Sequence, residues 1–187
     1  MVFAHDTEAA LASTANLINT AVPGVPGLDS VADLDRFVKQ EQFSGSREHS
    51  AAELRAVQDM RTELRTIWTA DEDAAVHMVN GLLARANALP QLVRHDAFDW
   101  HLHATAPDAP LALRMGVEAA MALVDVLRSK ELDRLKVCAA EDCDAVLIDL
   151  SKNHSRRYCD TGNCGNRANV AAYRRRKSAQ APQPATG

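Results

Sequence analysis

Apolar residues recur every three or four positions through most of the first 130 residues, which is the spacing of one face of an α-helix. Ser50 and Glu53 stand at capping-box spacing ahead of one such run, and Asp6 or Thr7 can cap the first run. Proline, glycine or small polar residues separate the runs. The pattern predicts helices over residues 6–21, 30–43, 50–68, 71–86 and 111–129.

Two segments depart from the helical period. Residues 90–105 are rich in aromatic and β-branched side chains, which predicts a short β-hairpin. Beyond residue 134 we expect short strands at 135–137 and 145–148, followed by a helix over 166–177. Residues 178–187 have no apolar period and are expected to be a disordered tail. The expected fold class is mainly α, with a helical N-terminal domain and a small C-terminal module of two strands and one helix.

The composition is that of a globular protein. Of 187 residues, 47% are apolar and 25% charged, and no apolar run approaches the roughly 20 residues that cross a bilayer. The first ten residues lack the basic-then-apolar order of a signal peptide. We therefore expect a cytoplasmic protein without a membrane partner.

Basic side chains are concentrated towards the C-terminal end. Residues 151–177 carry eight basic side chains and one acid, a net charge of +7, whereas residues 1–150 carry −11. A basic module on an acidic body suggests a polyanionic partner; a solvated helix end that complements the helix dipole is the alternative. The candidate nucleic-acid contacts are Lys152, Arg156, Arg157, Arg167, Arg174, Arg175, Arg176 and Lys177.

Four cysteines form two doublets, Cys138-x4-Cys143 and Cys159-x4-Cys164. In a reducing compartment such doublets hold a metal more often than they form disulfides, and a segment of about 40 residues is too small to be stabilised by its core alone. Four thiolates suit one structural Zn²⁺ and leave no position for water or substrate, which argues against a zinc hydrolase. Disulfides, free thiols and an iron–sulfur cluster remain alternatives.

The backbone near the second doublet is expected to serve the metal. Cys164 is placed in the first helical turn, where backbone N–H groups favour a thiolate. Gly162 and Gly165 are expected to permit tight turns.

The run Cys164-Gly-Asn-Arg167, preceded by Ser155-Arg-Arg-Tyr-Cys159, resembles the CGNR zinc finger. Ala15–Thr20, and Pro110-Leu111 before a long alanine-rich helix, are similar to the helical ABATE domain that precedes the finger in this family. The resemblance covers nearly the whole chain to residue 177. It implies a bacterial stress-induced transcription regulator with an ABATE-like domain over residues 1–130 and a four-cysteine zinc finger over 134–177.

By this resemblance and by charge, the finger is expected to bind DNA, with RNA as the alternative partner. Arg156, Arg157 and residues 175–177 are the expected phosphate contacts, with Arg167 or Arg174 as base readers. Arg167 can instead brace the metal loop. Tyr158 and Tyr173 are expected to pack on the zinc core rather than stack on bases.

The acidic body has two equally weighted interpretations, a sensor for a small-molecule or protein ligand and a homodimerisation module. An adaptor without direct DNA readout is a further alternative. His95, His101 and His103 lie in the expected hairpin, and the last two share a strand face, a spacing compatible with metal. Because no phosphate loop, serine elbow or zinc-protease pattern accompanies them, surface histidines are the commoner explanation. No enzymatic activity is expected.

Overall fold

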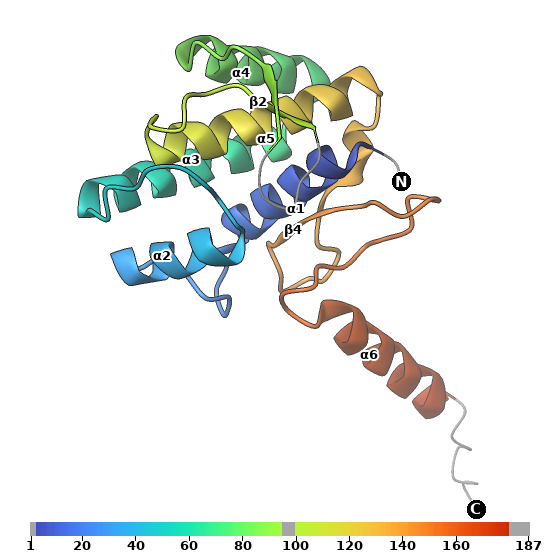
Figure 1. The fold of residues 1–187 in the computed structure, drawn as a ribbon. Coiled ribbons are helices and arrows are strands. Elements are labelled where there is room, and N and C mark those ends of the chain that lie inside the picture. The colour runs from blue at the N-terminus through green and yellow to red at the C-terminus, as the bar shows by residue number, and fades with distance from the viewer. Residues whose placement is uncertain (1–2, 95–99, 180–187) are drawn as a thin grey trace, which may run out of the picture.

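The computed structural model describes residues 3–94 and 100–179. Within these ranges the chain is mainly helical, with two small antiparallel hairpins (Figure 1), so the expected fold class is confirmed. The helices are α1 (His5–Asn19), α2 (Val31–Gln40), α3 (Ala51–Trp68), α4 (Glu72–Arg85), α5 (Leu111–Arg128) and α6 (Cys164–Ala179), with the 3-10 turn η1 (Leu132–Arg134). The strands are β1 (Gln91–Val93), β2 (His101–His103), β3 (Leu135–Val137) and β4 (Val146–Ile148). The expected tail, residues 178–187, lies outside the described residues from 180 on.

Helix capping explains where several elements begin. Ser50 Oγ accepts the Glu53 N–H at 3.0 Å, which confirms the predicted cap of α3. The predicted cap of α1 is wrong, because this helix begins at His5 after Ala4, which makes no side-chain cap bond. Thr7 Oγ1 instead donates to Asp125 Oδ2 of α5 at 2.7 Å. Thr7 therefore joins two helices rather than starting one.

The helical core is built around α5, which packs against α1, α3 and α4. Val117, Ala120 and Leu123 of α5 are buried at helical spacing, as the apolar period requires. At Gly116 of α5 a Cβ would lie 2.6 Å from Met60 Sδ of α3, so a larger residue there would require the Met60 side chain to shift. The N-terminal hairpin lies at the edge of this core, with Leu92 paired to Leu102.

The C-terminal hairpin packs into the helical body. In β4, Val146 and Ile148 belong to the helical core, whereas Leu147 between them packs with the cysteines. Alternate residues of a strand point to opposite faces, so β4 forms part of two cores at once. Trp68 of α3 donates its Nε1–H to Lys136 O of β3 at 3.4 Å. The small module is therefore joined to the helices through both of its strands.

The last helix, α6, projects away from the rest of the molecule (Figure 1). It begins at Cys164, two residues before the predicted start. In the part of the chain that the structure describes, no helix is both long and apolar enough for a bilayer crossing.

Candidate zinc centre and basic surface

Four cysteines meet in the C-terminal module: Cys138 and Cys143 precede β4, Cys159 follows it, and Cys164 begins α6. The Sγ atoms of Cys143 and Cys159 are 3.7 Å apart, as are those of Cys159 and Cys164, and all four Sγ atoms, including Cys138, lie within 4.8 Å of one another. A tetrahedral zinc ion with Zn–S bonds of about 2.3 Å places its sulfurs about 3.8 Å apart. The four thiols are free, and their sulfurs are too far apart for disulfides, whose S–S bond is about 2.05 Å. The donor set therefore fits one structural zinc ion.

Burial disfavours the ionised form of these thiols. Burial raises the pKa of Cys138, and it raises the pKa of Cys143 to about 12. Burial also opposes ionisation of Cys159, but hydrogen bonds from Thr161 Oγ1, at 3.3 Å, and from the Gly162 N–H lower its pKa to about 7. Four neighbouring thiolates are stable together only beside a positive ion. A divalent metal ion supplies the positive charge that stabilises these buried thiolates.

The loop between Cys159 and Cys164 depends on the small size of one glycine. A Cβ at Gly162 would lie 2.9 Å from Cys164 Sγ, whereas a Cβ at Gly165 would meet Tyr158 at an ordinary 3.7 Å. The left-handed residue in this loop is Asn163, with φ of 51°. Gly162 lies in a turn, as expected, whereas Gly165 lies in the first turn of α6, and neither has a left-handed φ. Gly162 provides room for a sulfur.

Arg167 braces the cysteine cluster. Its Nη2 donates to Cys164 Sγ at 3.1 Å, and its guanidinium contacts both carboxylate oxygens of Asp142 at 2.6 and 3.2 Å. These contacts join the first turn of α6 to the loop that carries Cys143. In this arrangement the guanidinium faces the metal loop.

The two tyrosines of the module differ in their surroundings. Tyr158 packs against the cysteine cluster, as expected. Tyr173 is 60% exposed on α6, so the expectation that it packs on the zinc core is wrong. The reason is that α6 leaves the module after its first turns, and residue 173 lies beyond the reach of the small core.

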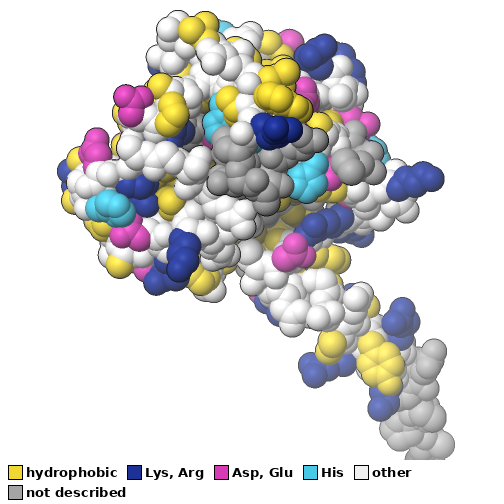
Figure 2. All heavy atoms as spheres, in the orientation of Figure 1, with side chains coloured by type: hydrophobic (Ala, Val, Ile, Leu, Met, Phe, Trp, Pro, Cys, Tyr) yellow, Lys and Arg dark blue, Asp and Glu magenta, His cyan; other side chains and the backbone are white. Residues whose placement is uncertain are grey.

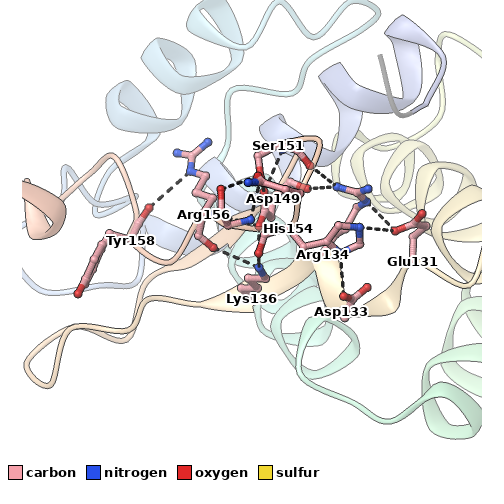
Figure 3. Close-up of polar contacts among 11 residues, drawn as sticks. Glu131, Asp133, Arg134, Lys136, Asp149, Ser151, His154, Arg156 and Tyr158 are labelled. Carbon is pink, nitrogen blue, oxygen red and sulfur yellow. Dashed lines mark hydrogen bonds and ion pairs between the residues drawn. The ribbon is translucent and has the colours of Figure 1, made fainter.

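A buried carboxylate organises the loop between the two halves of the module (Figure 3). Asp149 is fully buried and accepts Lys136 Nζ at 2.6 Å and the backbone N–H groups of Ser151 and Arg156, each at 2.9 Å. Arg134 Nη1 donates to the carbonyl oxygens of Asp149 and Ser151. Burial alone would raise the pKa of the Asp149 carboxyl group, but these donors hold it well below its usual range. Asp149 therefore fixes the course of the loop that carries the first basic residues.

Sequence reasoning missed Asp149. The sequence feature that could have revealed its role is an acid directly after the apolar run Val146–Ile148 and before a basic loop. An acid beside a buried strand is rarely tolerated without partners, since a buried charge is costly unless paired.

A second group of ligating atoms lies beside this loop. His154 Nδ1 is 2.8 Å from Asp133 Oδ2, and its Nε2 is 3.4 Å from Glu131 Oε2. The same Glu131 oxygen accepts Arg134 Nε at 2.7 Å. His154 presents a different nitrogen to each carboxylate, and these contacts hold the loop against η1.

Comparison with protein-family models matches both parts of the chain in order. A family model described as "CGNR zinc finger" matches residues 134–177, and the ABATE model, described as "Putative stress-induced transcription regulator", matches residues 11–130. The chain belongs to the ABATE family. The resemblance inferred from the sequence is thus confirmed, and the CGNR match together with the cysteine cluster supports one structural zinc ion. Neither description names a catalytic activity. No curated protein matches the chain.

The basic side chains of the CGNR finger are placed differently from one another. Arg156 is half-buried and pairs with Asp160, and Arg167 pairs with Asp142. The other predicted contacts are exposed and form no ion pair within the described ranges; they are Lys152, Arg157, Arg174, Arg175, Arg176 and Lys177. Figure 2 shows Lys and Arg side chains spread around the projecting α6. Four of these unpaired cations, Arg174 to Lys177, are thus on the helix that projects from the body.

The histidines of the N-terminal hairpin do meet. His101 and His103 share one face of β2, and their Nε2 atoms are 3.0 Å apart. His95 lies outside the described residues. Among the residues that the structure describes, no third ligating side chain completes a metal-binding group with this pair.

Proposed function

We propose that the protein is a DNA-binding transcription regulator. Cys138, Cys143, Cys159 and Cys164 ligate one structural Zn²⁺, the basic loop and α6 contact DNA, and the ABATE domain acts as sensor or oligomerisation module. With four thiolates the zinc ion has no open position for substrate, so the site has a structural role and no catalytic one.

The observation that carries the proposal is the charge of α6. Four consecutive cations, Arg174 to Lys177, are exposed and without ion-pair partners in the described part of the chain, on a helix that projects from the body. Maintaining adjacent like charges without partners costs free energy by self-repulsion, and a polyanion relieves that repulsion. Phosphate neutralisation supplies most of non-specific affinity for DNA.

We assign the basic residues two roles. Arg167 braces the zinc loop, because its guanidinium is engaged by Asp142 and Cys164. Arg157 and the Arg175–Lys177 run contact phosphates, and Lys152 and Arg156 act from the loop that Asp149 holds in place. Arg174, seven residues after Arg167, lies on a similar face of α6 and is the candidate base reader.

The proposal is tested by measuring affinity of the zinc-loaded protein for duplex DNA by fluorescence anisotropy at several salt concentrations. Replacing Arg175 and Arg176 by Gln should reduce the slope of log K against log salt by about 2, since each lost phosphate contact removes about one unit. The matched control replaces two exposed cations of the body, Lys39 and Arg55, by Gln and should leave the slope unchanged.

Two results would reject the proposal: no binding at low salt, or equal slopes for the finger variant and the body variant. Competition with structured RNA tests the choice of partner. If RNA displaces the DNA at lower concentration than unlabelled duplex does, RNA replaces DNA as the partner.

A further inference from the structure

A cavity of about 370 Å³ lies in the ABATE domain between α1, α5, β2 and the segment that follows α2. This volume is within the range of small-molecule binding sites. No role for it follows from the zinc finger, which is at the other end of α1. Its described lining includes both apolar and charged side chains, and these indicate which class of ligand fits the cavity.

The apolar side chains that line the cavity are only partly buried. Ala10 of α1, Phe43, and Met121 and Val124 of α5 line the cavity and are each partly buried. Ser13 also belongs to the lining; its Oγ is buried and has no hydrogen-bond partner among the described residues. Buried polar atoms are normally hydrogen-bonded, so this unpartnered hydroxyl beside the cavity is unusual.

The charge of the lining is negative. Asp6, Glu41 and Asp125 line the cavity and accept hydrogen bonds from neutral donors: Asp6 from the Thr7 N–H at 3.0 Å, Glu41 from Asn16 Nδ2 at 3.0 Å, and Asp125 from Thr7 Oγ1 at 2.7 Å. None of these three carboxylates forms an ion pair within the described ranges. Glu118 adds a fourth carboxylate, and Arg128 is the one Arg or Lys of the described lining. A lining with four acidic side chains and one arginine favours a cationic ligand.

We propose that this cavity binds a small organic cation whose ammonium group is carried on an apolar skeleton. The ammonium group contacts Asp125 and its neighbours, and the skeleton covers Phe43 and Met121. This ligand class would be the one that the ABATE domain senses, and the sensor role itself rests on the proposed function.

The position of α1 gives this site a connection to the finger. Residues of the N-terminal half of α1, from Asp6 to Ser13, line the cavity. Asn19, at the C-terminal end of the same helix, hydrogen-bonds to the backbone of Val146 in β4. A ligand that bears on one end of α1 therefore acts on an element whose other end contacts the finger.

The test uses two probes of matched shape and opposite charge, 2-phenylethylamine and 3-phenylpropionate. Calorimetric titration of the zinc-loaded full chain should show saturable binding of the amine and none of the acid. Asp125→Asn should weaken amine binding about tenfold or more, because it removes a charge while its amide oxygen can still accept from Thr7. Ala9→Leu, at an exposed position of the lining, should weaken binding by filling the cavity.

The control is Asp59→Asn, which neutralises an exposed acid of α3 outside the cavity and should leave amine affinity unchanged. The proposal is overturned if the amine does not bind saturably, if the acid binds as tightly, or if Asp125→Asn and Ala9→Leu have no effect. The titration contains no DNA. Failure of amine binding therefore leaves the DNA proposal intact, and failure of DNA binding leaves this result intact.

Discussion

The side chain of Asn19 in α1 pairs with the backbone of Val146 in β4 through two hydrogen bonds. Asn19 Nδ2 donates to Val146 O at 2.9 Å, and the Val146 N–H donates to Asn19 Oδ1 at 2.7 Å. Both residues are buried. The side-chain amide therefore makes the two backbone hydrogen bonds that a neighbouring strand would make to Val146. It connects the ABATE domain to the CGNR finger.

Asn19→Ala should destabilise the protein by about 1–3 kcal/mol, because it leaves a buried N–H and a buried carbonyl of Val146 without partners. The free energy of unfolding in urea measures the loss, and faster hydrogen exchange of the Val146 amide locates it. The control is Asn16→Ala on the same helix, where the side chain is exposed and its amide donates to Glu41. Equal losses in the two variants would contradict a special role for Asn19.

Gly162→Ala should weaken zinc binding, because its new methyl group would lie 2.9 Å from Cys164 Sγ and displace that ligand. Competition with a chromophoric chelator measures zinc affinity. Gly165→Ala is the matched control, since its methyl group meets Tyr158 at 3.7 Å and alanine favours the helix. If both variants keep zinc as the wild type does, the steric argument is wrong.

Asp149→Asn should cost about 3–5 kcal/mol, as removal of one partner from a buried ion pair does, since Lys136 and two backbone N–H groups then face an amide. DNA affinity should fall as well, because the loop that carries Arg156 and Arg157 loses its anchor. Urea unfolding and DNA anisotropy measure the two effects. Asp144→Asn, at an exposed acid of the same module, is the control. Full DNA affinity in Asp149→Asn protein would show that the loop does not need this anchor.

The environment of Glu53 predicts that the stability of the helical body depends on pH. Burial opposes its ionisation, but Arg47 and the N–H groups of Glu48 and His49 donate to it and lower its pKa below the usual 4.5. A carboxyl group with a lowered folded-state pKa stabilises the fold above its unfolded-state pKa, and this contribution is lost as pH falls through the folded-state pKa. Glu53→Gln should therefore be less stable than the wild type by about 1.5–3 kcal/mol at pH 7.

The difference between Glu53→Gln and the wild type should shrink as the pH is lowered from about 5 towards 3, as measured by urea unfolding at each pH. Glu48→Gln, at an exposed acid three residues after Gly45, serves as the control and should track the wild type. A gap that is the same at every pH would mean that the ionised form of Glu53 is not what stabilises the fold.

Much of the secondary structure followed from local patterns. The apolar period located the helices to within a few residues, because burying one face of a helix requires that spacing wherever the helix packs. Capping of α3 by Ser50 was predictable because the cap and its partner are three residues apart. The helix ends at α1 and α2 were less well predicted, because several nearby polar residues could serve as caps or stops.

The sequence by itself also indicated the zinc chemistry, since each cysteine doublet is short enough to bring two thiolates to one metal ion. Tertiary structure decided the rest. Asn19 and Val146 are 127 positions apart, and the pairing of Lys136 with Asp149 and the engagement of Arg167 by Asp142 likewise depend on how distant segments pack. The spacing of residues along the sequence indicates which face of a helix or strand is apolar. Only the folded chain determines which polar groups from distant segments come into contact.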